Sequence, residues 1–220
     1  MANRISARFA DKICISFDET ENKIDKKYRK KIIKTGTPIR KSILTGNKEK
    51  GYKFTTLNDK KPVILVMGGS LGAKQVNDLI TKAVVEILTT HQIVHLTGKN
   101  NATGIQKNGY VQFEFINDEL KDIYAITDIV ITRGGANSLF EMALLGKKVI
   151  CIPISHNCSR GEQVDNAEYF VEKLGWKMLV GDISANLLIS TIKNIAKSVT
   201  QKYTKNGTDK IVKLIKSYDK

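Results

Sequence analysis

The chain has 220 residues, enough for one substantial core with roughly 40 to 60 residues left over. Its longest apolar runs, 63–67 and 149–154, are far shorter than the ~20 residues that span a bilayer, and residues 1–12 lack the apolar core of a secretory signal. Three cysteines and three histidines, without metal-ligand spacing, argue against a disulfide framework and a structural zinc site, so we expect a cytosolic protein.

The net charge of +14 is concentrated near the amino terminus. Between Lys23 and Lys53 there are twelve Lys or Arg residues and two acidic ones, a surplus of ten positive charges. Such a block can attract an anionic membrane, nucleic acid or a phosphorylated substrate. It is equally typical of a Lys-rich composition on solvated faces. Nucleic acid is the weakest of these interpretations, because the block lacks interleaved aromatic residues for base stacking.

Residues 1–45 do not look like a complete unit. We expect the end of a helix at Arg4–Asp11, short strands at Ile13–Ser16 and Lys31–Thr35, and a turn at Thr35–Arg40 in which Pro38 is placed to begin a short helix. The polar segment 46–61 is expected to be a linker. Residues 1–45 therefore form a first region, separate from the remainder of the chain.

From Pro62 onward, strands alternate with helices, which predicts an α/β fold with a doubly wound parallel sheet over residues 62–200. The expected strands are Val63–Met67, Ile93–Leu96, Tyr110–Phe113, Ile129–Thr132, Val149–Ile152 and Lys177–Val180. Five helices are expected. One runs from Ala73 to about Leu88, a second starts at Asn117-Asp118, and a third comes after the loop 133–137 and ends at Leu145. The last two run from Glu162 to Leu174 and from Ala185 to Ser198, the latter with Ser184 as its cap. Residues 201–220 are expected to form a basic carboxyl-terminal helix or tail.

Two Gly-rich loops come after the first and fourth of these strands, at 68–72 and 133–137. In the common strand order 3-2-1-4-5-6, these strands are neighbours at the topological switch point, where ligands bind. Helix amino termini after both loops would favour a phosphate or diphosphate. Neither loop is a GxGxxG or P-loop motif, and the second strand is not followed by a ribose-binding acid, which disfavours dinucleotide redox chemistry.

Single polar and aromatic residues carry little weight from the sequence alone. Glu141 could accept the hydroxyls of a ribose, but an acid near a helix start is favourable without any ligand. His95 and His156 are each more typical of packed or hydrogen-bonded residues than of catalytic ones. Trp176 is more typical of core than of a stacking platform.

Four segments together resemble the MurG family of UDP-N-acetylglucosamine transferases. They are GGSLGAKQVND (Gly68–Asp78), FIND (Phe115–Asp118), TRGGANSLFEMALLGK (Thr132–Lys147) and SRGEQVDNAEYF (Ser159–Phe170). The opening NRISARFADKICISF and TGTPIR are similar to the end of that family's amino-terminal domain and its crossover. The resemblance covers nearly the whole chain, in the family's order.

This resemblance implies the second, donor-binding half of a GT-B glycosyltransferase. The reaction is then inverting transfer of N-acetylglucosamine from UDP-N-acetylglucosamine to a lipid-linked muramoyl-pentapeptide, with no protein-bound metal. The implied donor-binding residues are Arg40, Gly69, Ser70, Gly72, Ile116, Gly135, Ala136, Asn137, Glu141, Gln163 and Asn166.

The family assigns different parts of the donor to these residues. Ser70 and Gly135–Asn137 would contact the diphosphate, and Ile116 the uracil through its backbone. Glu141 would hold the ribose hydroxyls and Gln163 those of the sugar. Arg40 would reach the donor from the interdomain segment. Two adjacent glutamines common in the family are Glu162-Gln163 here, and TGTPIR replaces the more usual TGNPVR.

The front half of the family's chain, with its acceptor site, is missing from this sequence apart from its tail. We therefore identify no catalytic base. The lipid-linked precursor is expected to bind through the missing domain, with the intact enzyme peripheral on the cytoplasmic face of the cell membrane. The alternatives are a UDP-sugar-binding subunit that is inactive without a separate acceptor domain, and a related GT-B enzyme with another UDP-sugar or lipid acceptor.

Overall fold

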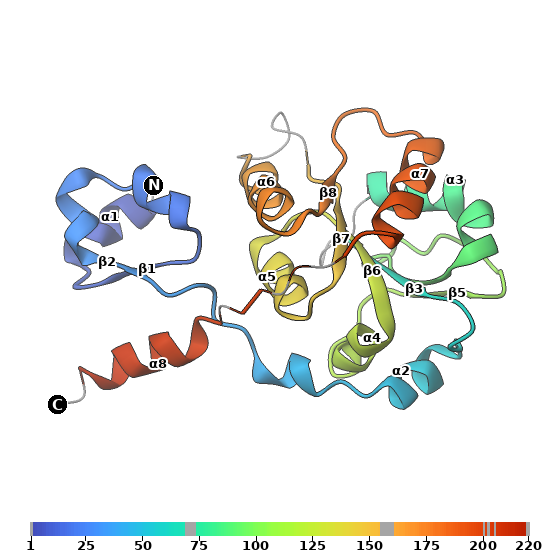
Figure 1. The fold of residues 1–220 in the computed structure, drawn as a ribbon, viewed down its shortest axis with the longest axis horizontal. Helices are drawn as coiled ribbons and strands as arrows, with labels where there is room; N and C mark the ends of the chain where they lie inside the picture. Colours follow the sequence, from blue (N-terminus) through green and yellow to red (C-terminus); the bar gives the residue numbers. More distant parts are fainter. Residues whose placement is uncertain are drawn as a thin grey trace. The chain divides into compact units, whose positions relative to one another are not determined.

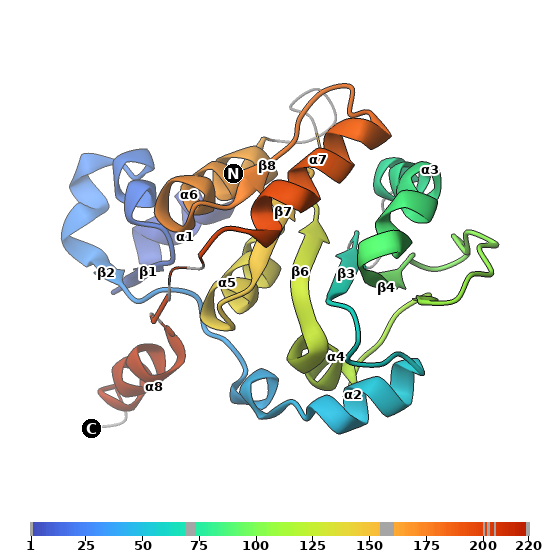
Figure 2. The same cartoon turned by 45° about the vertical axis from the view of Figure 1, so that its right-hand side comes forward.

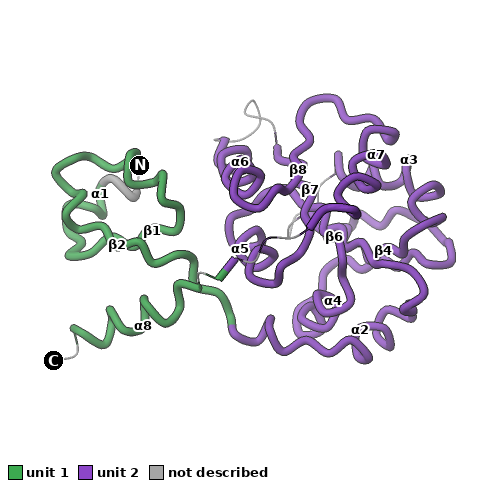
Figure 3. The backbone as a smooth tube through the Cα atoms, in the orientation of Figure 1, with its two compact units in different colours: residues 1–40, 204–220 green, residues 41–203 purple. Residues whose placement is uncertain are grey.

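The computed structural model describes residues 2–68, 74–154, 161–199, 201, 203–204 and 206–218. Its contacts divide the chain into two compact units (Figure 3). We refer to residues 1–40 and 204–220 as the small unit, and to residues 41–203 as the sheet unit.

The small unit is built from both ends of the chain. Its elements are α1 (Ala2–Phe9), β1 (Ile13–Ile15), the 3₁₀ helices η1 (Asp18–Lys23) and η2 (Lys26–Lys31), β2 (Ile32–Lys34) and α8 (Thr208–Lys216). β1 and β2 pair in parallel, with Ile13 opposite Ile32. The Nζ of Lys31 donates to the carbonyl oxygen of Ala10 at 2.7 Å and so satisfies an acceptor just beyond α1. The two short strands predicted here are confirmed.

Backbone contacts join the two ends of the chain within the small unit. The N–H of Gly207 donates to the carbonyl oxygen of Thr37 at 3.0 Å. The hydroxyl of Thr208 lies 3.0 Å from both the backbone N and the carbonyl O of Ile39. A side chain at Gly207 would collide with the carbonyl oxygen of Gly36, so the approach requires glycine.

The short helix expected to begin at Pro38 begins instead at Lys41. The 3₁₀ helix η3 runs from Lys41 to Thr45, in the sheet unit. The carbonyl oxygen of Ile39 already accepts from Asn206 and from Thr208, so it does not serve as the first acceptor of a helix.

The sheet unit contains six parallel strands in the order β5-β4-β3-β6-β7-β8 (Figure 1). Their bounds are β3 (Val63–Met67), β4 (Gln92–Leu96), β5 (Tyr110–Phe113), β6 (Thr127–Thr132), β7 (Lys148–Cys151) and β8 (Lys177–Met178). This is the predicted 3-2-1-4-5-6 order, so the doubly wound α/β fold is confirmed. β3 is apolar throughout and lies at the centre, as a strand covered on both faces requires.

Helices cover both faces of the sheet (Figure 2). Ile64 and Val66 of β3 pack in one cluster with α3 (Lys74–Thr90) and α7 (Ala185–Ala196). The other helices that come after strands are α4 (Leu120–Ile126), α5 (Ala136–Leu144) and α6 (Glu162–Leu174). Among the described residues, no helix is both long and apolar enough to cross a membrane.

The segment 46–61, expected as a linker, contains the helix α2 (Lys48–Thr55), which packs on α4. Asn47 caps this helix by accepting from the N–H of Lys50, and its own N–H donates to Asp122 of α4 at 2.7 Å. A Cβ at Gly51 would collide with the carbonyl oxygen of Asp122. The polar sequence concealed this docking, because a close backbone approach needs a glycine rather than apolar side chains.

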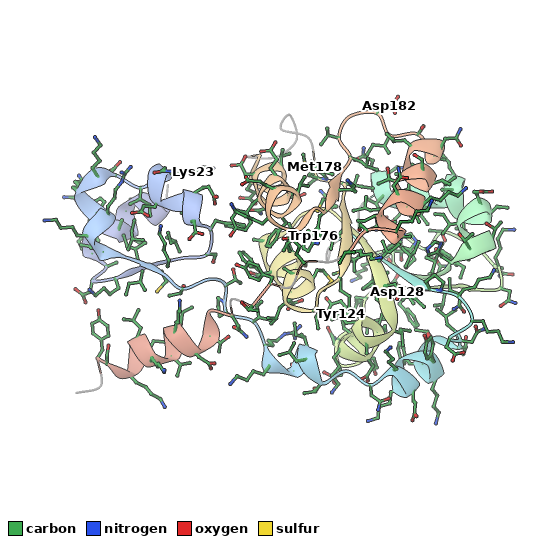
Figure 4. The ribbon with its side chains drawn as sticks, viewed as in Figure 1. Lys23, Tyr124, Asp128, Trp176, Met178 and Asp182 are labelled. Carbon is green, nitrogen blue, oxygen red and sulfur yellow. The ribbon has the colours of Figure 1, made fainter. Side chains whose placement is uncertain are left out.

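The carboxyl-terminal part of the sheet unit matches expectation closely. The hydroxyl of Ser184 accepts from the N–H of Leu187 and caps α7, as predicted. Trp176, labelled in Figure 4, is 2% exposed and stacks on Phe170 with ring centroids 4.8 Å apart. Its predicted role in the core is confirmed.

Candidate functional site

The carboxyl ends of β3 and β6 lie side by side at the switch point of the sheet. Met67 and Thr132, the last residues of these strands, are register partners. From β3 the chain passes to β4 on one side, and from β6 it passes to β7 on the other. Both Gly-rich loops therefore start at one edge, which is where ligands of such sheets bind. Gly69, Ser70 and Gly72 of the first loop lie outside the described residues.

The second loop is fixed by glycine geometry and opens α5. Gly134 has φ of +95°, and a Cβ there would lie 2.8 Å from the backbone oxygen of Gln163. Gly135 is the N-cap of α5, and a Cβ there would meet no atom of the described residues within 4 Å. Within the described part of the chain, no side chain caps this helix. The first N–H groups of α5, at Ala136 and Asn137, are thus oriented to bind an anion at an open position.

Glu141 lies in the second turn of α5 and is half-buried. The buried hydroxyl of Tyr124, on α4, donates to its Oε2 at 3.3 Å. Figure 4 labels Tyr124 beside α4. A phenol from a neighbouring helix therefore restricts where this carboxylate can point.

Gln163 and Asn166, in the first two turns of α6, are half-buried and bonded to the edge of the sheet. The amide oxygen of Gln163 accepts from the backbone N–H of Ile154 at 3.2 Å. The amide nitrogen of Asn166 donates to the carbonyl oxygen of Gly134 at 3.3 Å. Both side chains thus fix the start of α6 against the ends of β6 and β7, a role that the sequence did not indicate.

The remaining two candidates, Ile116 and Arg40, come from other parts of the chain. Ile116 is half-buried and comes after β5, two strands from β3 in the sheet. The backbone N–H of Thr97, just after β4, donates to the carbonyl oxygen of Phe113, so the ends of β4 and β5 are tied together. Arg40 is exposed and belongs to the small unit, whereas the other described candidates belong to the sheet unit.

Two polar residues near this edge were not selected from the sequence as part of a site. Arg133 directly precedes Gly134 and is half-buried, and burial lowers the pKa of its guanidinium. His95 is fully buried in β4, and burial lowers its pKa to about 4, so the ring is neutral near pH 7. The expectation that His95 is a packed or hydrogen-bonded residue is confirmed. His156, for which the same was expected, lies outside the described residues. The sequence signal that could have selected Arg133 is its position between the end of a strand and two glycines.

In the described ranges, no group of three or more His, Cys, Asp or Glu residues is placed to hold a metal ion. The arrangement offers instead a helix amino terminus at an open position, an oriented carboxylate and two amides close to the same edge. Such a set suits a ligand with a phosphate group and several hydroxyls.

Comparison with known proteins identifies relatives. Residues 63–217 match the model of the glycosyltransferase family 28 C-terminal domain. A UDP-N-acetylglucosamine–N-acetylmuramyl-(pentapeptide) pyrophosphoryl-undecaprenol N-acetylglucosamine transferase of Bacillus thuringiensis subsp. konkukian is 42% identical over 225 residues. That alignment covers 98% of this chain and 62% of the relative. The enzyme of the same function in Legionella pneumophila is 41% identical, with the same two coverages.

Solved structures share the fold. MurG of Acinetobacter baumannii superposes with a TM-score of 0.68 at 20% identity, covering 99% of this chain and 63% of that one. A UDP-GlcNAc 2-epimerase of Methanocaldococcus jannaschii, in complex with UDP-GlcNAc and UDP, gives 0.64 at 12% identity, covering 96% and 62%. The Rossmann-like fold of a GT-B half is thereby confirmed, and the chain spans about 62% of the length of the curated relatives it matches. With the family model covering most of the sheet unit and α8, the chain belongs to glycosyltransferase family 28 and carries its C-terminal domain.

Proposed function

We propose that this chain is the donor-binding half of an inverting glycosyltransferase. The enzyme transfers N-acetylglucosamine from UDP-N-acetylglucosamine to a lipid-linked muramoyl-pentapeptide precursor of peptidoglycan. The observation that carries this proposal is the pairing of Met67 with Thr132, which brings two Gly-rich loops to one edge of the sheet. The names of relatives at 41–42% identity support the identity of donor and acceptor.

The donor lies along the carboxyl edge of the sheet unit. Its diphosphate binds at the backbone of Gly135, Ala136 and Asn137, where the dipole of α5 favours negative charge. Glu141 accepts the ribose hydroxyls, in an orientation supported by Tyr124.

Other groups complete the donor site. The backbone of Ile116 contacts the uracil, and Gln163 and Asn166 the sugar. The first loop contributes Gly69, Ser70 and Gly72, and Arg40 is a further proposed donor-binding residue.

The reaction is a displacement at the anomeric carbon of the sugar. A muramoyl hydroxyl oxygen forms the new bond to that carbon, and the bond to UDP breaks with its electron pair leaving on the diphosphate. The hydroxyl proton passes to a base for which we identify no residue in this chain. Fixed N–H dipoles at the glycine loops stabilise the growing charge, so the mechanism does not require a protein-ligated metal.

The acceptor site comes from a part of the enzyme that this chain does not contain. The chain spans about 62% of its curated relatives. Two-stranded sheets are marginally stable alone, and the small unit has a two-stranded parallel sheet together with exposed Ile5 and Phe9 on α1. Both features suit a surface completed by further polypeptide.

This last point favours a second candidate function, a UDP-sugar-binding subunit that is inactive by itself. The two are separated by measuring transfer of labelled N-acetylglucosamine to a lipid-linked muramoyl-pentapeptide. The chain is assayed alone and after fusion behind the first part of the Bacillus relative, the part that it does not match. If the fusion is active and the chain alone is not, the chain is supported as a donor half that needs an acceptor domain. If the fusion is folded and binds donor but remains inactive, transferase function is contradicted.

Association with the cytoplasmic face of the membrane is part of the proposal. α8 is amphipathic, with Lys210, Lys213 and Lys216 beside exposed Val212 and Ile215. The basic block in residues 23–53 adds further positive charge, and each of these two features suits anionic lipid. Co-sedimentation with vesicles should increase with anionic lipid content. Binding indifferent to that content would contradict the proposal.

A further inference from the structure

A chain of buried polar side chains lies behind the proposed donor site. His95, in β4, is 0% exposed. Its Nδ1 lies 2.9 Å from the hydroxyl of Tyr110 and its Nε2 lies 3.0 Å from Oδ1 of Asn77. The hydroxyl of Tyr110 lies 2.9 Å from that of Thr103. The ring therefore connects α3 to β5 through the interior.

The chemistry of the partners fixes the positions of the protons. The amide nitrogen of Asn77 donates to the carbonyl oxygen of Thr97 at 2.9 Å. A carbonyl oxygen only accepts, so the other end of this amide, Oδ1, faces His95 and must accept from it. Nε2 of His95 therefore carries the hydrogen, and Nδ1 accepts from the hydroxyl of Tyr110. One neutral tautomer satisfies the bonds of His95 to both Asn77 and Tyr110.

These bonds meet at the edge where the donor is proposed to bind. Asn77 lies in the first turn of α3, the helix that comes after β3 and the first Gly-rich loop. Thr97 is the first residue after β4, and its N–H donates to the carbonyl oxygen of Phe113 at the end of β5. The amide of Asn77 thus sets the first turn of α3 relative to the ends of two strands.

The polar chain is a costly way to fill this space. Ile93 and Val94, beside His95 in β4, are both fully buried and apolar. A buried polar group stabilises the fold little and must find partners, whereas an apolar residue of similar size needs none. A polar residue at position 95 is explained if the orientation of Asn77 matters for binding.

We propose that His95 is a positioning residue for the donor diphosphate, acting through Asn77 on the first turn of α3. This inference rests on the proposed function, since it assumes that the diphosphate binds at this edge. His95 itself is fully buried and makes no contact with the donor.

The test compares two substitutions that each keep half of the ring's bonding. The amide nitrogen of His95→Gln takes the place of Nε2 and can still donate to Asn77. The amide of His95→Asn takes the place of Nδ1, keeps the bond to Tyr110 and is too short to reach Asn77. Both remove the aromatic ring, so a purely structural role predicts similar losses for the two.

Dissociation constants for UDP are measured by calorimetry on the full chain. We expect His95→Gln to remain within about threefold of the unsubstituted protein, and His95→Asn to bind about tenfold more weakly. Asn77→Ala should match His95→Asn, and the double variant should bind no more weakly than Asn77→Ala alone. His91→Gln is the control, because His91 precedes the same strand at the opposite edge and bonds to Thr90.

The outcomes separate the two levels of the proposal. Equal loss in His95→Gln and His95→Asn, or additive losses with Asn77→Ala, would overturn the positioning role and leave the donor site intact. Absence of UDP binding by the folded, unsubstituted chain would overturn the proposed function and this inference with it. If His95→Asn does not fold, Asn77→Ala replaces it in the comparison with His95→Gln.

Discussion

The hydroxyl of Tyr124 donates to Oε2 of Glu141 at 3.3 Å and links α4 to α5. A half-buried carboxylate without such a partner samples several rotamers, and a ligand would have to immobilise it. The tyrosine orients the carboxylate before any ligand binds.

Removing that hydroxyl should therefore weaken ligand binding without removing the acid. We expect Tyr124→Phe to raise the dissociation constant for UDP-N-acetylglucosamine about five- to tenfold, or ~1 kcal/mol for one hydrogen bond. Calorimetric titration measures this change. Tyr52→Phe serves as the control, since Tyr52 lies on α2, where burial and the charge of Asp128 raise the pKa of its hydroxyl. An unchanged affinity in Tyr124→Phe would mean that the bond does not orient Glu141 for binding.

Alanine substitutions at Gly134 and Gly135 should have different effects, the first on stability and the second on donor binding. Gly134→Ala places a side chain at φ of +95° and 2.8 Å from the backbone of Gln163, so we expect a loss of about 2 kcal/mol in the free energy of unfolding. Gly135→Ala has ordinary φ of −63° and open space, so stability should change by less than ~0.5 kcal/mol.

The same methyl group at position 135 projects where the diphosphate is proposed to lie. Donor affinity should therefore fall in Gly135→Ala although its stability does not. Urea unfolding of both variants gives the free energy of unfolding, and calorimetry gives the dissociation constant for the donor. Full affinity in Gly135→Ala would exclude this turn from the phosphate site.

The docking of α2 on α4 predicts that the segment 46–61 contributes to stability. Gly51→Ala would collide with the backbone of Asp122, and overpacking of this kind costs about 1–3 kcal/mol. Lys53→Ala, on an exposed position of the same helix, should change the free energy of unfolding by less than ~0.5 kcal/mol. Equal melting temperatures for the two variants would show that α2 behaves as the linker first expected.

Burial of His95 predicts a loss of stability in acid. The folded-state pKa is about 4, below the ordinary value of 6.5, so between these values the unfolded chain binds the extra proton. Stability attributable to this ring is therefore complete above pH 6.5 and is lost as the pH falls toward 4, by up to about 3 kcal/mol. Other groups titrate in the same range, so the measurement is the difference in unfolding free energy between the unsubstituted protein and His95→Gln at about pH 7 and about pH 4.5. A difference that does not change with pH would contradict the burial of a neutral ring.

Local patterns were sufficient for the sheet. β3, β5 and α6 have the bounds expected from apolar runs and turn residues, because a central parallel strand and an amphipathic helix each leave a periodic signal. The strand order was assumed to be the common 3-2-1-4-5-6 order, and the structure has that order. The resemblance of four motifs then supplied the candidate donor residues, and most of those that the structure describes come from α5 and α6, which follow β6 and β7.

Contacts between distant segments left no such signal. The amides of Gln163 and Asn166 bond to backbone groups of other loops, and Asn77 meets His95 across 18 residues. The joining of Ile39 to Thr208 spans 169 residues. A single polar residue looks the same in sequence whether its partner is water, a ligand or a distant carbonyl, so only the folded arrangement distinguishes these roles.

The most direct test of the donor site is calorimetric titration of the 220-residue chain with UDP-N-acetylglucosamine and with UDP-glucose. The Glu141→Ala variant is titrated with UDP-N-acetylglucosamine in the same way. We expect saturable binding that prefers the N-acetylated sugar and weakens at least about 30-fold in the variant, since a carboxylate that accepts two ribose hydroxyls contributes ~2 kcal/mol. A chain that is folded by circular dichroism yet binds no UDP-sugar, or binds equally well without Glu141, would contradict the proposed donor site.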